Sequence, residues 1–257
     1  MRIVHNTMTD FTFDEKTHRY YLDGKPMTGV TTVLGVINKP MLLPWASKMA
    51  CEYVKENLHS MDELDAVLEL AKNAHTRKRD SAAEAGTDVH AECERYIRDC
   101  INNGELVDYH VKPDGDSQLQ HFMDWAIKNK VIFTASEEHV YSASLFVGGT
   151  FDFTCEMDGL KYVGDIKTSS SIYGREPFAQ TAAYQFMISE MAGKKPEEIA
   201  DRRLIINLKK TGTFDEDKDV YISEHYEDDI ELFMSALTMY RNVGRFEPLN
   251  YLAKRKQ

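Results

Sequence analysis

Gly148-Gly149-Thr150-Phe151-Asp152 is followed, after an Asp158-Gly159 turn, by Gly164-Asp165-Ile166-Lys167-Thr168, and these two segments predict the centre of the fold. Side chains alternate between the two faces of a strand, so Asp165 and Lys167 share one face and Ile166 points to the other. Asp-Gly between two strand-like runs is typical of a hairpin turn. We therefore expect adjacent strands that place two carboxylates and a lysine on one patch.

This patch has the composition of a site for phosphodiester chemistry. Carboxylate oxygens are hard ligands that suit Mg²⁺ or Mn²⁺. A lysine beside such an ion can stabilise charge that develops on a phosphate, or can orient an attacking water. A D-x-K tripeptide by itself is more often an ordinary ion pair on a strand, so the rest of the chain has to decide between the two interpretations.

Size and charge narrow the classes of protein. With 257 residues and 42% hydrophobic content, the chain can build one domain with a proper core. The formal net charge of −11 argues against a protein that coats nucleic acid by bulk charge, but it leaves room for a focused basic groove. The four cysteines have no C-x-x-C pairing, which argues against a zinc finger. One cluster of basic residues precedes a predicted helix: Lys72, Arg77, Lys78 and Arg79.

Periodicity and turn residues predict the order of elements along the chain. A β-hairpin (11–13 and 19–22) is followed by helices at 44–58, 62–79, 81–102 and 117–129. Short strands are expected at 131–133, 138–141, 149–156 and 161–168, then a helix at 177–192. Strands at 203–208 and 220–223 and a helix at 226–243 complete the pattern.

Four further residues fall where a metal-dependent nuclease would need them. His90, at the end of Gly86-Thr87-Asp88-Val89-His90, could supply a metal nitrogen, although a single helix histidine is more often structural. Glu137 precedes a strand and could be a further metal-binding or water-activating carboxylate, and its neighbour Glu138 leaves this assignment open by one position. Gln180 and Tyr184 are spaced i, i+4 on one helix face, where they could hold a carboxylate, a water or a phosphate.

Taken in order, G-x-x-x-H, an upstream Glu, G-x-x-D, D-x-K and Q-x-x-x-Y form a pattern that resembles the RecB-like exonuclease branch of the PD-(D/E)XK nuclease superfamily. The flanking residues look especially like those of phage-encoded exonucleases and of the mitochondrial genome maintenance exonuclease. The similarity extends N-terminally to His18–Gly24 and Gly29–Leu34, so it covers roughly residues 11 to 190.

The resemblance implies an α/β fold with a restriction-endonuclease-like core, in which a central mixed β-sheet is flanked by helices. A β-hairpin and helices would form an N-terminal cap. We therefore expect a single nuclease domain over residues 1–257, with the cap segment at 1–60 and the catalytic core at 80–245.

The resemblance also implies roles for the matching residues. His90, Asp152, Asp165 and the carbonyl of Ile166 would hold one or two Mg²⁺ or Mn²⁺ ions. Asp152, Asp165, Lys167 and Glu137 would be the catalytic residues. Three residues would contact the nucleic acid: Gln180, Tyr184 and Thr168. No iron–sulfur cluster is expected, because the members of the branch that carry one use cysteines C-terminal to the core and no cysteine follows Cys155.

The function expected from this pattern is a Mg²⁺- or Mn²⁺-dependent deoxyribonuclease, an exonuclease that acts at DNA ends or on single strands in replication, recombination or repair. The alternatives are a structure-specific endonuclease and a nuclease-fold module that binds nucleic acid or a partner without cutting. The expected partners are single-stranded or duplex DNA ends and a separate recombinase or single-strand-annealing protein. No membrane is expected to be involved, and the expected location is the cytoplasm of a bacterium, with a phage or bacterial gene as the source.

Overall fold

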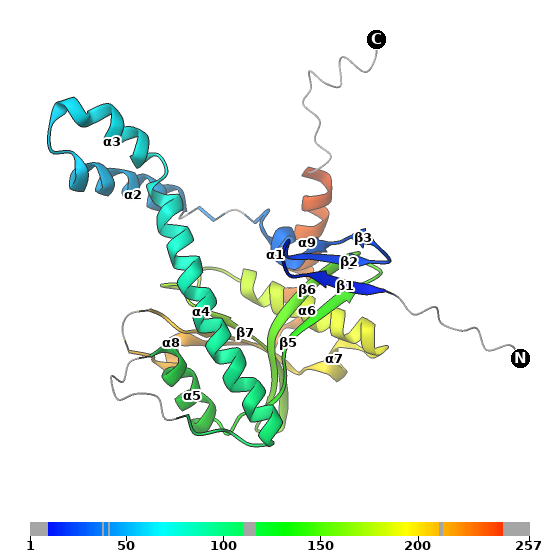
Figure 1. Ribbon diagram of the computed structural model, residues 1–257. Coiled ribbons are helices and arrows are strands. Elements are labelled where there is room, and N and C mark those ends of the chain that lie inside the picture. Colours follow the sequence, from blue (N-terminus) through cyan, green and yellow to red (C-terminus); the bar gives the residue numbers. More distant parts are fainter. Residues whose placement is uncertain (1–9, 38, 41, 110–116, 211–212, 244–257) are drawn as a thin grey trace, which may run out of the picture. The chain divides into compact units, whose positions relative to one another are not determined.

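A computed structural model of the chain describes residues 10–37, 39–40, 42–109, 117–210 and 213–243 (Figure 1). The chain forms two compact units, one of Met1–Val36 with Cys93–Gln257 and one of Ile37–Glu92. The expected N-terminal segment, 1–60, is thus divided between the two units. Both ends of the expected domain, 1–9 and 244–257, lie outside the described residues.

The first unit is built on a mixed sheet. In the part of the chain that the structure describes, the strand order is β4-β6-β7-β8-β9, and β5 also pairs with β6. The β4–β6 and β7–β8 pairs are parallel, and the other pairs are antiparallel. The strands are β4 (Thr28–Gly29), β5 (Ile132–Ser142), β6 (Val147–Met157), β7 (Leu160–Lys167), β8 (Arg202–Asn207) and β9 (Val220–Ser223). The expected α/β fold with a central mixed sheet is confirmed at this level.

Helices flank this sheet (Figure 1). They are α1 (Val30–Leu34), α5 (Gln118–Lys128), α6 (Glu176–Ala192), α7 (Pro196–Ile199), α8 (Glu216–Asp219), α9 (Tyr226–Val243) and the last turns of α4 (Ala74–Asn103). The core between sheet and helices is aromatic. Phe122 of α5 packs against Phe133 and Phe153 of the sheet, and Tyr96 of α4 meets Phe122 and Phe133 edge-on. Rings in these edge-to-face arrangements contribute beyond the area that they bury.

The β6–β7 hairpin forms as predicted. Asp158 and Gly159 both have positive φ, 50° and 76°, which is the conformation of a two-residue turn whose twist matches that of the flanking strands. The N-terminal hairpin is confirmed as well, as β1 (Phe11–Asp14) and β2 (Arg19–Leu22), and a short third strand, β3 (Lys25–Pro26), extends it.

The expected break between strands at 131–133 and 138–141 is wrong, because these segments are one strand, β5. Two local irregularities let the strand continue. The register shifts between Phe133 and Ala135, which leaves Thr134 as an extra residue, and Glu137 adopts a φ of 50°. A bulge of this kind bends a strand without ending its pairing, so residues 134–137, between the two expected strands, lie inside β5.

The second unit consists of α2 (Leu42–Asn57), the 3-10 turn η1 (Met61–Glu63), α3 (Leu64–Ala71) and the first part of α4. Two helices were predicted at 62–79 and 81–102, but the boundary between them is wrong. The break lies at Lys72–Asn73, between α3 and α4. Arg77 donates to the carbonyl of Leu70, and this hydrogen bond satisfies one of the carbonyls left open where α3 ends. Ser81, where the second of these helices was expected to begin, is an exposed position within α4.

Two further observations concern the chain as a whole. Within the described ranges, no helix combines the length and the apolar character that a membrane span requires. Among the residues that the structure describes, the four cysteines form no disulfide; Cys51 is exposed, and Cys93, Cys100 and Cys155 are buried.

Candidate metal centre

The candidate site lies where β6 and β7 stop pairing. The last pair towards the site joins Phe153 to Gly164, and the next in this register would join Asp152 to Asp165. Instead, the backbone N–H of Ile166 donates to Oδ2 of Asp152 at 2.6 Å. The Asp152 side chain thus takes the place of a ladder hydrogen bond, and two carboxyl groups lie where the strands separate.

A chain of polar contacts links this point to α6. Nζ of Lys167 lies 2.7 Å from Oδ2 and 3.0 Å from Oδ1 of Asp165. The same ammonium donates to Oε1 of Gln180 at 3.1 Å, and Nε2 of Gln180 donates to the hydroxyl of Tyr184 at 3.0 Å. The structure therefore brings together four of the residues singled out in the sequence. Asp165 and Lys167 come from β7, and Gln180 and Tyr184 come from α6.

Glu137 joins the same centre. It is half-buried, and one of its carboxylate oxygens lies within 4.8 Å of one of Asp152. Glu138 is exposed and instead lines a cavity with Val140 and Ile188. Of the two glutamates that the sequence left open, Glu137 is thus the one beside Asp152. Its positive φ is uncommon for a residue with a long side chain and is typical of strained positions at functional sites.

The electrostatics of the centre are those of crowded carboxylates. Burial, together with the charge of Asp152, raises the pKa of Glu137 to about 8. Burial also raises the pKa of Asp152 to about 6, although Lys167 and the Ile166 N–H oppose that rise. Burial lowers the pKa of Lys167, but Asp165 and Asp152 outweigh this effect, so the pKa is raised overall and the lysine stays charged. Carboxylates that lie this close together repel one another when both are charged. A divalent cation bound between them would offset this repulsion.

The remaining predicted site residues are Thr168, Ile166 and His90. Thr168 follows the last residue of β7 and is half-exposed, whereas Ile166 is buried within the strand. His90 lies on α4 in the helical unit, one turn before Glu94 on the same face of a continuous helix. Glu94 belongs to the first unit, where its charge contributes to the raised pKa of Glu137.

Two glycines let tyrosines lie directly on β6. A Cβ at Gly149 would come within 2.5 Å of the ring of Tyr184, and a Cβ at Gly148 within 2.7 Å of Tyr20. The hydroxyl of Tyr20 also lies 2.8 Å from Oγ1 of Thr150. Packing therefore requires glycine at both positions, because a side chain at Gly148 would displace the ring of Tyr20 on β2 and one at Gly149 the ring of Tyr184 on α6.

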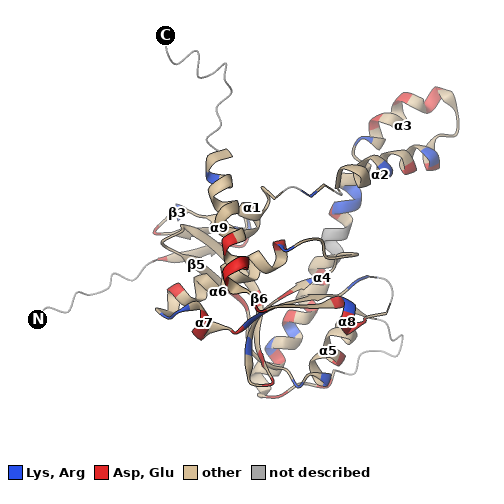
Figure 2. Cartoon of the chain, turned by 180° about the vertical axis from the view of Figure 1, so that it is seen from behind, with Lys and Arg blue, Asp and Glu red and all other residues tan. Residues whose placement is uncertain are grey.

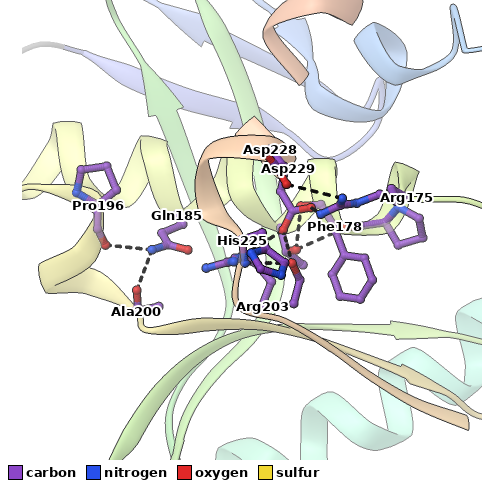
Figure 3. Close-up of polar contacts among 12 residues, drawn as sticks. Arg175, Phe178, Gln185, Pro196, Ala200, Arg203, His225, Asp228 and Asp229 are labelled. Carbon is purple, nitrogen blue, oxygen red and sulfur yellow. Dashed lines mark hydrogen bonds and ion pairs between the residues drawn. The ribbon is translucent and has the colours of Figure 1, made fainter. Parts of the chain in front are cut away.

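Sequence reasoning missed the residues that anchor the start of α6. Arg175, which precedes the helix, donates to Oδ1 of Asp229 at 2.8 Å (Figure 3). The other oxygen of Asp229 accepts from Ser223 at 2.5 Å and from the fully buried Arg203 at 3.4 Å. The buried carboxylate of Asp229 thus ties α6 and β8 to α9. These partners are 6 to 54 residues from Asp229 in sequence, so no local pattern identifies them.

Comparisons with known proteins add little to this geometry. No family model matches the chain, and no curated protein matches it. A solved structure titled "Crystal structure of SSO0001" aligns with 77% of this chain and 86% of its own, at 12% sequence identity and a TM-score of 0.32.

Proposed function

We propose that this chain is a metal-dependent DNA exonuclease of the PD-(D/E)XK superfamily, in its RecB-like branch, which hydrolyses phosphodiester bonds at DNA ends or on single strands. The observation that carries the proposal is the arrangement around Lys167. Its ammonium is held by Asp165 and Gln180 beside the point where β6 and β7 separate and where Glu137 and Asp152 lie within 4.8 Å of each other.

The side chains fit a divalent cation. Glu137 and Asp152 are half-buried carboxyls with raised pKa values, and Asp165 is buried with Lys167 as its cation. In this proposal Asp152, Asp165 and Glu137 supply oxygen ligands and the carbonyl of Ile166 a further one. Bound Mg²⁺ or Mn²⁺ would lower the pKa of a coordinated water and offset charge on the scissile phosphate.

His90 is assigned as a nitrogen ligand on the basis of the helix that carries it. The last turns of α4 bring Glu94 near enough to Glu137 to raise its pKa, and His90 precedes Glu94 by one turn on the same face. An imidazole among carboxylates is a common ligand set for Mn²⁺ and related ions. This assignment belongs to the proposal, as does the role of Thr168 in contacting the nucleic acid.

The protein's own groups then have distinct tasks. Lys167, charged and held between Asp165 and Gln180, would orient the attacking water or neutralise the phosphate as negative charge develops on it. Gln180 holds the lysine in place, and Tyr184 supports Gln180 from one turn further along α6. Burial and the charge of Asp165 raise the pKa of Tyr184, so its hydroxyl stays protonated and neutral near the carboxylates.

Positive charge for the phosphate backbone is available on the helical unit. Lys72, Arg77, Lys78 and Arg79 are exposed, the last three on the first turns of α4, where Figure 2 shows basic residues in blue. Since the chain as a whole is strongly acidic, we propose that DNA is held by such local clusters and not by bulk charge.

The test is cleavage of end-labelled single- and double-stranded DNA with Mg²⁺, Mn²⁺ or EDTA. We expect the wild-type protein to shorten the labelled strand progressively with metal and to leave it intact with EDTA. Asp165→Ala and Lys167→Ala should each lose activity by about 100-fold or more, because each removes a group that acts on the transition state.

A matched pair of substitutions sharpens this test. Glu137→Gln should reduce cleavage, whereas Glu138→Gln, one residue further along β5 and exposed, should leave it unchanged. Internal cuts in circular DNA would indicate an endonuclease instead. DNA binding without metal-dependent cleavage in any form of the substrate would favour a non-cutting module and overturn the proposal.

A further inference from the structure

The last residue of β8, Asn207, carries a buried side-chain amide. Its side chain is 1% exposed, and neither Oδ1 nor Nδ2 has a hydrogen-bond partner among the residues that the structure describes. A buried polar group that is left unsatisfied destabilises the folded state, so a native protein rarely keeps one without a reason.

Asn207 stands directly beside Lys167. In the parallel β7–β8 pair, Lys167 and Asn207 are register partners. Neighbouring strands lie about 4.8 Å apart, and register partners point to the same face of the sheet. The amide therefore faces the same side as Lys167 and Asp165, and it does so at the carboxyl ends of both strands, where the candidate site lies.

The hydrogen-bond partners of Lys167 indicate why its ammonium would need a further acceptor when metal is bound. Its ammonium contacts both oxygens of Asp165, at 2.7 and 3.0 Å, and Oε1 of Gln180, at 3.1 Å. A divalent ion bound by Asp165 would share the oxygens of this carboxylate and would repel the ammonium of Lys167. Lys167 then has to exchange part of its contact with Asp165 for another acceptor.

We infer that Asn207 is a positioning residue for Lys167, whose ammonium turns to the Asn207 carbonyl when Asp165 coordinates metal. This inference rests on the proposed function. A neutral amide suits the task because it accepts a hydrogen bond from the ammonium without neutralising its charge, which a carboxylate would do. Gln180 remains the second acceptor, so the lysine stays fixed on the side of α6.

The experiment replaces Asn207 with leucine, which has nearly the same shape but no acceptor. Without metal, we expect Asn207→Leu to melt at the wild-type temperature or above it, since an unpaired amide is removed from the interior. Calorimetric titration with Mn²⁺ in the absence of DNA should give a Kd weaker by about 10-fold, because partners one step removed from a metal typically contribute 10- to 100-fold to affinity or activity. The kcat for DNA cleavage should fall by a similar factor while KM stays within about twofold.

The control is Ile206→Leu, which alters the neighbouring residue of the same strand on the opposite face and should leave Mn²⁺ affinity and kcat unchanged. A lower melting temperature for metal-free Asn207→Leu would mean that the amide is a structural group, and it would overturn the inference. Unchanged Mn²⁺ affinity and kcat in this variant would overturn it as well.

Failure of the proposed function gives a different result. In that case the wild-type protein itself would neither bind Mn²⁺ nor cleave DNA. A wild-type protein that does both, beside an Asn207→Leu variant that does both equally well, would refute only the role of Asn207.

Discussion

Oδ2 of Asp152 accepts a hydrogen bond from the backbone N–H of Ile166, 2.6 Å away. This contact makes a side chain part of the sheet, because it occupies the place of a main-chain partner where β6 and β7 separate. It also fixes the carboxyl group of Asp152, which lies within 4.8 Å of that of Glu137. The candidate centre is thus built into the sheet itself and does not depend on a surface loop.

Asp152→Asn separates the structural and the chemical part of this contact. An asparagine can still accept the Ile166 N–H through its carbonyl oxygen, but it is a much weaker ligand for a divalent ion. We expect the metal-free variant to melt at or slightly above the wild-type temperature at pH 8, because the wild-type carboxylate is then charged while half-buried. Added Mn²⁺ should raise the melting temperature of the wild type and not that of the variant, as measured by scanning calorimetry. A variant that Mn²⁺ stabilises as much as the wild type would remove Asp152 from the ligand set.

The pH dependence of stability follows from the two raised pKa values. In the folded protein the pKa of Glu137 is raised from its ordinary value of 4.5 to about 8, and the pKa of Asp152 from 3.8 to about 6. Between these limits the folded protein holds protons that the unfolded chain has released, so the free energy of unfolding falls as pH rises. Without metal, we expect the contribution of Asp152 to be lost as pH rises towards 6 and that of Glu137 as it rises towards 8.

Denaturant unfolding from pH 4.5 to 8.5 measures this slope. Glu137→Gln is the control, because it removes one titrating group, and the difference between wild type and variant isolates its contribution. With Mn²⁺ present the trend should reverse, since deprotonated carboxylates bind the ion more tightly. A wild-type slope equal to that of the variant would contradict the raised pKa of Glu137.

The buried carboxylate of Asp229, which anchors the start of α6 through Arg175, can be tested by substitution. Asp229→Asn leaves the buried Arg203 without its counter-charge and weakens the contact with Arg175, so we expect a loss of about 3–5 kcal/mol in the free energy of unfolding. The adjacent Asp228 is the matched control. It is exposed and lies 3.7 Å from Arg175, so Asp228→Asn should cost less than about 1 kcal/mol. Urea unfolding of the two variants measures both values, and equal losses would show that burial of the pair has no special weight.

Gly149 should not tolerate a side chain. A Cβ there would lie 2.5 Å from Cε1 of the buried Tyr184, so Gly149→Ala should destabilise the protein by about 1–3 kcal/mol through overpacking. Because Tyr184 supports Gln180, DNA cleavage should fall as well. Gly29→Ala, where the nearest atom lies at an ordinary 3.5 Å, should cost less. Thermal melting and the cleavage assay together test this, and a stable, fully active Gly149→Ala would show that the ring of Tyr184 can move without consequence.

The basic cluster of the helical unit predicts a change in salt dependence. If Lys78 contacts a phosphate, Lys78→Ala should weaken DNA binding and reduce the slope of log affinity against log salt by about 1. Lys194, which is exposed but precedes α7 in the other unit, is the control, and Lys194→Ala should leave the slope unchanged. Binding to labelled DNA at several salt concentrations gives both slopes. Equal slopes for wild type and Lys78→Ala would place the DNA elsewhere.

Elements whose signals are local could be predicted from the amino-acid sequence. The Asp158-Gly159 turn and the alternation around it predicted the β6–β7 hairpin, and with it the common face of Asp165 and Lys167. The i, i+4 spacing predicted that Gln180 and Tyr184 meet on α6, as their hydrogen bond shows. Such features lie within a turn or an alternating run, where the chain's own geometry dictates which residues are neighbours.

Other features of the site depend on contacts between segments that are distant in sequence. The choice of Glu137 over Glu138 depends on a bulge and a positive φ within β5, which are set by pairing with β6. The place of Asn207 beside Lys167 depends on the register of two strands separated by α6 and α7, and the anchor at Asp229 joins residues up to 54 positions apart. Local patterns carry the period of a segment but not its register against a distant one, because that register is set by packing across the whole sheet.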